Sequence, residues 1–296
     1  MTNIMNVAVL GATGNLGPHI IKALLTQGFR VTALTRGSSS SVLPEGVEVK
    51  TVDFGSQGSI VEALSGQDAV VSAIGTLAVP LQLSLIDAAV SANVKRFIPS
   101  EFGVDTRLIA GTKLAPLLQG KLKVVEYLKE KAKQHPEFSW TALATGSLFE
   151  SALRNGGFGF DLSKRHAIIF DSGDARFSPT SFDIVGKAVA AILTKTDETE
   201  NQYLGVSSFT TSQTEILKIL EKETGTKWDV DQVSTADLEK VGWQKLGEKN
   251  PLGAFDLMKA FQFQDGQQRS LSDDASASSV LDLPAEDVSC LIKALV

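Results

Sequence analysis

Apolar runs alternate with amphipathic segments along the first half of the chain. Six short runs are rich in Val, Ile, Leu and Ala and end at glycine or polar residues, which is typical of strands. These predicted strands cover residues 7–10, 30–35, 47–52, 69–74, 96–99 and 140–144. Between most of them, apolar residues recur every three or four positions, as on one face of a helix. The predicted helices cover residues 20–25, 60–64, 81–94 and 115–133.

The alternation of strand and helix predicts the fold class. Parallel neighbouring strands need a crossover connection between them, and that connection is usually a helix. Strands that alternate with helices therefore favour a parallel sheet covered by helices on both faces. We predict an α/β protein with a Rossmann, doubly wound parallel sheet.

The pattern loosens after residue 144. A glycine-rich segment covers residues 155–160 and a polar segment covers 171–176. Helical patterns return at residues 183–193, 214–223, 235–241 and 286–295. We therefore predict an NADP-binding Rossmann domain over 1–150, completed by about 178–206. A smaller, interleaved C-terminal substrate lobe is predicted over 151–296.

Composition and charge narrow the class of protein. The chain has 296 residues, 43% of them hydrophobic and 21% charged, with a formal net charge of −6. This composition is that of a soluble globular protein. The lysines and arginines form no basic stripe, so nucleic acid is not an expected partner. No run approaches the roughly 18 apolar residues of a membrane helix, and no basic region precedes the first strand, so we expect neither a membrane nor a targeting segment.

The single cysteine bears on the compartment. Cys290 lies among Val288, Leu291 and Ile292, so we expect a buried, unreactive thiol. One cysteine cannot form a disulfide framework, which favours a reducing compartment, and we predict a cytoplasmic protein. His166 has no carboxylate or second histidine at ligand spacing, so no metal site is predicted. The sequence leaves the oligomeric state open between a monomer and a homodimer.

A glycine-rich sequence joins the first predicted strand to the first predicted helix. Gly11, Gly14 and Gly17 have the spacing G-x-x-G-x-x-G. Glycine there lets the backbone turn tightly, approach a diphosphate and pack the helix closely on the strand. The N-terminus of the helix favours negative charge. The alternative is a structural turn without a ligand. The predicted cofactor contacts in this loop are Gly11, Ala12, Thr13, Gly14, Asn15, Leu16 and Gly17.

The end of the second predicted strand indicates which dinucleotide binds. In NAD-binding proteins an acidic residue there binds the ribose hydroxyl. Here the residues are Thr35 and Arg36, followed by Gly37 and Ser38. A guanidinium with small neighbours suits the 2′-phosphate of NADPH, which is therefore the predicted cofactor. The alternative is that Arg36 is a solvated loop residue.

Residues that follow the other predicted strands are further candidates for the cofactor pocket. Ligands of doubly wound sheets bind at the carboxyl ends of the strands. Phe149 is a candidate for contact with the nicotinamide, but it could equally fill the core. The candidates are Asp53 and Phe54 beside the adenine, Ala73, Ile74 and Gly75 beside the ribose, Ser100, Glu101 and Phe102 at the nicotinamide end, and Gly146 and Phe149 after the sixth strand.

Five features of the chain resemble one group of proteins. They are GATGNLG at residues 11–17, Arg36, KRFIPSEFG at 95–103, GKLKVVE at 120–126 and FSPTSFDIVGKAV at 177–189. KRFIPSEFG is the most specific of them. Over about residues 5–195 the chain resembles the isoflavone reductase-like and NmrA-like branch of the atypical short-chain dehydrogenases/reductases, and the C-terminal third matches only in outline. The resemblance implies an NADPH-dependent enzyme similar to phenylcoumaran benzylic ether, pinoresinol-lariciresinol and isoflavone reductases.

The resemblance also implies a catalytic lysine. In similar enzymes a lysine on the helix after the SEFG motif acts as acid or base, and the corresponding residue here is Lys121. A lysine that is shielded from water has its ammonium form disfavoured, so it can exchange a proton with a substrate oxygen. The same position makes Lys121 a predicted cofactor contact. The alternative is a solvated helix lysine. Glu101 could orient Lys121 or make a structural hydrogen bond to a loop.

A second sequence pattern offers an alternative to Lys121 as the group that exchanges the proton. Tyr127 and Lys131 match Y-x-x-x-K, the proton-relay pair of ordinary short-chain dehydrogenases. Tyr127 follows Lys121 by six residues, roughly 240° around a helix, so the two side chains do not readily face one pocket. We interpret the Y-x-x-x-K match as accidental.

Together these features predict the function. We expect an NADPH-dependent reductase of a hydrophobic small metabolite, such as an aromatic compound, an enone or an ether, with Lys121 as general acid or base. Phe158, Phe160, Phe177 and Phe182 either line an apolar substrate site or belong to the core. One alternative is an NmrA-like regulator that senses the dinucleotide without turnover; such regulators tend to lack the lysine. Another is a redox-neutral isomerase or cyclase on the same scaffold.

Overall fold

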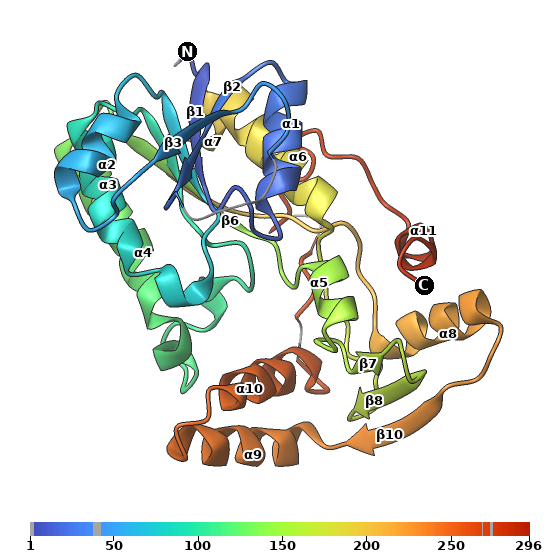
Figure 1. The fold of residues 1–296 in the computed structure, drawn as a ribbon. Coiled ribbons are helices and arrows are strands. Elements are labelled where there is room, and N and C mark those ends of the chain that lie inside the picture. The colour runs from blue at the N-terminus through green and yellow to red at the C-terminus, as the bar shows by residue number, and fades with distance from the viewer. Residues whose placement is uncertain (1–2, 38–42, 268, 273–274) are drawn as a thin grey trace. The chain divides into compact units, whose positions relative to one another are not determined.

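The computed structural model describes residues 3–37, 43–267, 269–272 and 275–296 (Figure 1). The chain divides into two units, and each unit is assembled from three segments. Unit 1 comprises Met1–Thr145, Phe182–Val206 and Ser276–Leu283. Unit 2 comprises Gly146–Ser181, Ser207–Ala275 and Pro284–Val296.

A parallel sheet of seven strands runs through unit 1, in the order β3-β2-β1-β4-β5-β6-β9. The order reverses between β1 and β4, which is the doubly wound arrangement and confirms the predicted α/β class. Six of the strands were predicted, and β9 at the edge was not. The strands are β1 (Asn6–Leu10), β2 (Arg30–Thr35), β3 (Glu48–Thr51), β4 (Ala69–Ser72), β5 (Arg96–Ile98), β6 (Ser139–Ala144) and β9 (Gln202–Gly205).

Helices cover both faces of this sheet (Figure 1). One face carries α2 (Gln57–Leu64), α3 (Leu81–Ser91) and α4 (Ala115–Gln134), and the other carries α1 (Gly17–Thr26) and α6 (Phe182–Thr194). Every residue of β4 and β6 is buried. Strands that are covered on both faces become continuous apolar runs, which is why the sequence predicts them well. Short elements complete the unit: α7 (Thr196–Thr199) and the 3₁₀ turns η1 (Thr76–Ala78) and η2 (Thr106–Leu108).

Unit 2 contains a mixed sheet of three strands in the order β10-β8-β7. β10 runs parallel to β8, and β7 runs antiparallel to it. The predicted helices at 214–223, 235–241 and 286–295 are present as α8, α9 and α11, whereas the three strands, α5 and α10 were not predicted. The elements are β7 (Phe160–Asp161), β8 (His166–Phe170), β10 (Asp229–Val233), α5 (Phe149–Arg154), α8 (Gln213–Thr224), α9 (Thr235–Gly247), α10 (Leu252–Phe263) and α11 (Val288–Lys293).

Aromatic rings form the core of unit 2. The ring of Phe158 lies 5.1 Å from that of Phe177, and the ring of Phe177 lies 5.3 Å from that of Phe263. Phe160 packs edge-on against Trp228, with ring centroids 6.1 Å apart. All five rings are buried. Of the two interpretations given above for Phe158, Phe160 and Phe177, the structure supports the core.

The expectation of a buried thiol is wrong, because Cys290 is exposed. The short helix α11 buries Ile292, and Cys290 lies on a different face. Within the described ranges, no helix has both the length and the apolar character that a membrane span requires. Over the same ranges, no three His, Cys, Asp or Glu side chains are grouped closely enough to hold a metal ion.

Candidate cofactor and catalytic site

The loop after β1 is built so tightly that only glycine fits at two positions. Gly11 has φ +75°, and a Cβ there would lie 2.3 Å from the carbonyl oxygen of Ala73. A Cβ on Gly17 would lie 2.3 Å from the carbonyl oxygen of Gly11. The amide of Gly14 donates to that same oxygen at 3.0 Å and closes the turn. The backbone of the loop therefore approaches both the end of β4 and the start of α1.

The exposed side of this loop fits a dinucleotide diphosphate. Thr13, Gly14 and Asn15 are exposed, whereas Ala12 and Leu16 are buried and anchor the loop. The residue before α1 makes no side-chain cap to the first helical amides. Uncapped amides at a helix N-terminus favour a bound anion. The cradle that a Cβ would fill and the accessible helix N-terminus both suit the cofactor that the sequence predicts.

The end of β2 presents Arg36 to solvent together with Gly37. Gly37 has φ +78°, and a Cβ there would lie 3.0 Å from Cγ2 of Thr51, so a glycine is suited to this turn as well. Ser38 lies outside the described residues. Asp53, after β3, accepts a hydrogen bond from the amide of Gly55 at 2.9 Å, and Phe54 packs partly against the core.

The structure brings together the segments after β1, β4 and β5. The amide of Ala73 donates to the carbonyl of Leu10 at 2.9 Å, and the hydroxyl of Ser100 donates to the carbonyl of Ile74 at 2.6 Å. The amide of Ser100 donates to Oε1 of Gln82 at 2.8 Å. These bonds hold the ends of neighbouring strands in one place, as the doubly wound topology predicts. Gly75 is exposed beside them, and Phe102 is buried.

Gly146 and Phe149 belong to unit 2. A Cβ on Gly146 would lie 2.3 Å from the carbonyl oxygen of Ser178, so this position requires glycine for packing. The ring of Phe149 is fully buried against Phe158 and Phe209, with centroids 5.7 and 5.2 Å apart. For Phe149 the structure supports the alternative of a core residue.

Lys121 lies on α4 and is only 7% exposed. Its Nζ is 3.7 Å from the position that a Cβ on Gly103 would take, so the ammonium lies against the segment that follows β5. Burial lowers the pKa of Lys121, and the negative charge of Glu101 opposes that effect. Over the described part of the chain, Lys121 forms no ion pair. The alternative of a solvated helix lysine is therefore wrong for Lys121, although it holds for its neighbour Lys123.

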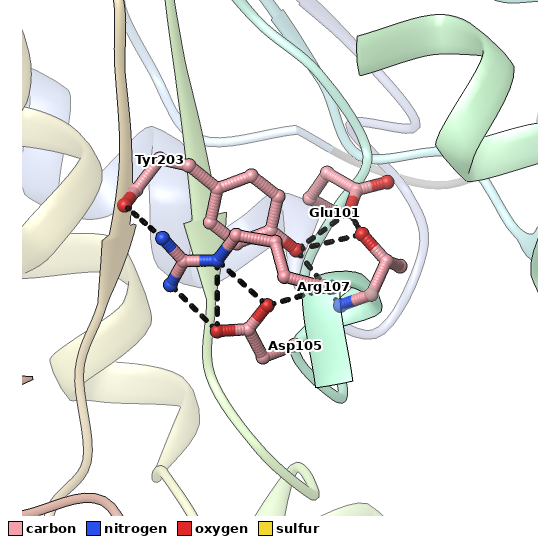
Figure 2. A network of polar contacts seen from close by, with 5 residues as sticks. Glu101, Asp105, Arg107 and Tyr203 are labelled. Carbon is pink, nitrogen blue, oxygen red and sulfur yellow. Dashed lines mark hydrogen bonds and ion pairs between the residues drawn. The ribbon is translucent and has the colours of Figure 1, made fainter. Parts of the chain in front are cut away.

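Glu101 is fully buried beside this lysine and is held by two hydroxyl groups (Figure 2). Its Oε2 accepts hydrogen bonds from Tyr203 at 2.8 Å and from Thr106 at 2.9 Å. The guanidinium of Arg107 lies over the Tyr203 ring, 4.3 Å from its centroid, and pairs with Asp105 at 2.6 Å. Burial raises the pKa of Glu101, while Lys121 and both hydroxyl donors oppose that effect.

Sequence reasoning missed Tyr203. It lies on β9, the strand that was not predicted, and burial beside the Glu101 charge raises its pKa. Of the two alternatives given above for Glu101, the structure shows the structural hydrogen bond to a loop, which comes from Thr106 of η2. No local signal links Tyr203 to Glu101, because the contact depends on β9 joining the sheet beside β6.

Tyr127 and Lys131 are both engaged elsewhere. The Tyr127 hydroxyl donates to Oδ1 of Asp87 on α3 at 2.6 Å, and Nζ of Lys131 is 2.7 Å from the same oxygen. Lys131 also lies over the Tyr127 ring, 4.9 Å from its centroid. The pair therefore ties α4 to α3, which supports the interpretation that the Y-x-x-x-K match is accidental.

The fold and the glycine loop define a Rossmann protein, and comparisons with known proteins identify the family. A model of the NmrA-like family matches residues 4–278. The oxidoreductase aprR of Aspergillus flavus is 40% identical over 296 residues, covering 99% of each chain. The oxidoreductase poxI of Penicillium oxalicum is 31% identical over 279 residues, 93% of this chain and 88% of that protein. The chain belongs to the NmrA-like family and is an oxidoreductase, so the resemblance stated above is confirmed.

Solved structures share the same fold. The structure of AtPrR2 with NADP⁺ and (+)pinoresinol has a TM-score of 0.80 at 24% identity and covers 100% of both chains. The leucoanthocyanidin reductase–NADPH complex from Vitis vinifera has a TM-score of 0.75 at 19% identity and covers 93% of both chains. At these identities the likeness establishes the fold of the whole chain, including the smaller mixed sheet.

Proposed function

We propose that this protein is an NADPH-dependent reductase of a hydrophobic, oxygenated small metabolite, such as an aromatic compound, an enone or an ether. In this proposal Lys121 exchanges a proton with the substrate oxygen. One observation carries the proposal: a lysine that is 7% exposed and forms no ion pair over the described chain lies at the end of β5, beside the predicted nicotinamide pocket.

The residues of unit 1 suit the cofactor. The loop Gly11–Gly17 would hold the diphosphate, and Arg36 would hold the 2′-phosphate, because a guanidinium matches phosphate geometry. Bound NADPH supplies the hydride. The solved NADP⁺ and NADPH complexes of similar fold support this assignment.

Lys121 is suited to proton exchange because its environment disfavours its charge. Burial lowers the pKa of Lys121, which makes its proton easier to give up than that of a solvated lysine. Glu101 keeps the ammonium form accessible by its opposite charge. A substrate oxygen placed against Nζ would receive the proton as it gains negative charge.

The substrate class rests on relatives. One structure of similar fold contains (+)pinoresinol, and a 28% identical isoflavone reductase homolog from Zea mays covers 74% of this chain. Both names point to oxygenated aromatic compounds. We extend this class, together with enones and ethers, to the present protein.

The test follows the oxidation of NADPH, by the absorbance of its reduced nicotinamide, against a panel of phenolic ethers, enones and ketones. We expect turnover with at least one class and a loss of roughly 10²- to 10⁴-fold in kcat for Lys121→Met. Lys123→Met, which changes an exposed lysine two positions away, is the matched control and should retain full activity.

Two further outcomes would change the proposal. Binding of NADPH without turnover of any substrate would favour a dinucleotide-sensing regulator over a reductase. Calorimetry tests the role of Arg36. If the wild type binds NADH and NADPH with equal affinity, and Arg36→Ala changes neither affinity, that role is refuted.

A further inference from the structure

The two oxygens of the Glu101 carboxyl group have different surroundings. Oε2 accepts from Tyr203 and Thr106, as described above. Oε1 is buried and has no hydrogen-bond partner among the described residues. Figure 2 shows Oε1 on the side of the carboxyl group away from these hydroxyls. A buried carboxylate oxygen without a partner costs free energy, so its presence calls for an explanation.

Lys121 lies beside the same short segment of backbone. A Cβ on Gly103 would be 3.7 Å from Nζ of Lys121 and 3.8 Å from the carbonyl oxygen of Glu101. Glu101 is the charged group that acts on Lys121. Both side chains are more than nine-tenths buried, so water screens their attraction poorly.

We propose that Glu101 is the positioning residue for Lys121: Tyr203 and Thr106 hold Oε2, and the remaining carboxylate charge keeps Lys121 protonated for donation. This inference rests on the proposed function of Lys121. In the proposed reaction Glu101 contacts no reacting atom and acts only through Lys121.

Burial raises the pKa of Glu101, and several neighbouring groups oppose this effect. Lys121 approaches from α4 with a positive charge, and Tyr203 from β9 donates a hydrogen bond. Asp105 opposes ionisation, but its own charge is paired with Arg107. Arg107 also donates to the carbonyl oxygen of Tyr203 at 3.3 Å, so η2 and β9 together fix the tyrosine. Lys121 on α4, Tyr203 on β9 and Thr106 of η2 thus offset part of the cost that burial imposes on the carboxylate.

The test titrates Lys121 directly, without turnover. Protein labelled with ¹³C at lysine Cε gives signals that move as each amine loses its proton, and the signal missing from Lys121→Met belongs to Lys121. In Glu101→Gln, which keeps the size of the side chain and removes its charge, we expect the titration midpoint of Lys121 to fall by about one pH unit or more. Glu126→Gln removes an exposed charge from the same helix and should leave the midpoint unchanged.

A midpoint of Lys121 that is the same in Glu101→Gln and in the wild type overturns the inference. If Glu101→Gln does not fold, the reciprocal experiment decides, because coupling between two titrating groups is mutual. The Glu101 carboxyl, followed by ¹³C-glutamate labelling, should titrate at higher pH in Lys121→Met than in the wild type. An unchanged Glu101 midpoint there also overturns the inference.

Tyr203→Phe tests the part played by β9. The variant keeps the ring beneath Arg107 and removes the hydroxyl that donates to Glu101. Loss of this hydroxyl should raise the titration midpoint of the Glu101 carboxyl. An unchanged midpoint would show that Tyr203 does not stabilise the Glu101 carboxylate. These titrations need no substrate, so failure of the proposed reductase activity and failure of the Glu101–Lys121 coupling give separate results.

Discussion

Unit 1 buries two cations at opposite ends of β5, and their surroundings differ. Arg96 opens the strand and is 2% exposed. Its guanidinium donates to the hydroxyls of Ser139, Thr141 and Thr199 and to the carbonyl of Thr196, at 2.8–3.0 Å. Lys121 lies against the segment that follows the same strand and has no comparable set of acceptors among the described residues.

Under the proposed function, the difference separates a structural cation from one that exchanges a proton. A buried charge costs less when neutral oxygens replace its lost water, and the Arg96 guanidinium has four such bonds. Burial lowers the pKa of both cations, but no comparable set of hydrogen-bonded oxygens among the described residues replaces the lost water of Lys121. The amino end of β5 therefore contributes stability, and under the proposed function the carboxyl end contributes the proton donor.

The largest effect is expected at the amino end. Arg96→Met should lower the free energy of unfolding by about 3 kcal/mol or more, because four buried oxygens lose their donor. Urea denaturation followed by circular dichroism measures this change. Arg30 also opens a strand but is exposed, so Arg30→Met should cost about 0.5 kcal/mol or less. Equal losses in the two variants would contradict the structural role of Arg96.

The next effect concerns pH at the carboxyl end. Only the ammonium form of Lys121 can donate, so kcat should fall about tenfold per pH unit once the pH exceeds the pKa of Lys121. Because burial lowers that pKa, the fall should begin below the ordinary lysine value of about 10.4. The profile is measured at saturating NADPH and substrate, with Lys123→Met as the control. A rate that stays constant to about pH 10 would speak against Lys121 as the donor.

A smaller effect is expected when Lys121 itself is removed. Lys121→Met should change the free energy of unfolding by about 1 kcal/mol or less, since methionine fills the volume of the lysine stem and removes a buried charge. Glu101 can then take up a proton, because burial raises its pKa. Denaturation under the conditions used for Arg96→Met makes the comparison direct. A loss as large as that of Arg96→Met would make Lys121 a structural cation as well.

The smallest effect is expected at Tyr127. Tyr127→Phe removes a hydrogen bond to Asp87 on the outer side of α4, which should cost about 0.5 kcal/mol and leave kcat unchanged. Denaturation and the NADPH assay on the same preparation check both expectations. A large loss of kcat would restore the Y-x-x-x-K pair as a candidate proton relay.

The parts of the fold that the sequence predicts are those with strong local signals. β1, β4 and β6 are buried on both faces and become nearly continuous apolar runs. The glycine loop is equally local, since Gly11 and Gly17 contact each other across six positions. Lys121 needed the family resemblance, because several lysines share α4 and sequence alone does not indicate which one is buried.

The parts that were missed lack such signals. β9 lies at the sheet edge and has only one buried residue, Gly205, and four of the five residues of β10 are exposed. β7 has two residues. The contact of Tyr203 with Glu101 spans 102 positions, so no periodicity within a segment could reveal it. Cys290 was misplaced because a short helix with apolar neighbours does not show which face is covered.

The close packing of α6 on α1 has a consequence for biosynthesis. A Cβ on Gly186 would lie 2.5 Å from the carbonyl oxygen of His19, and the ring of Phe182 lies 5.0 Å from that of His19. The helix that follows the glycine loop thus acquires its neighbour only after the ribosome has translated past Thr194. Until then the nascent chain carries an uncovered apolar surface on α1. A fragment that stops at Thr145 lacks α6, so we expect it to expose this surface and to aggregate more readily than the whole chain.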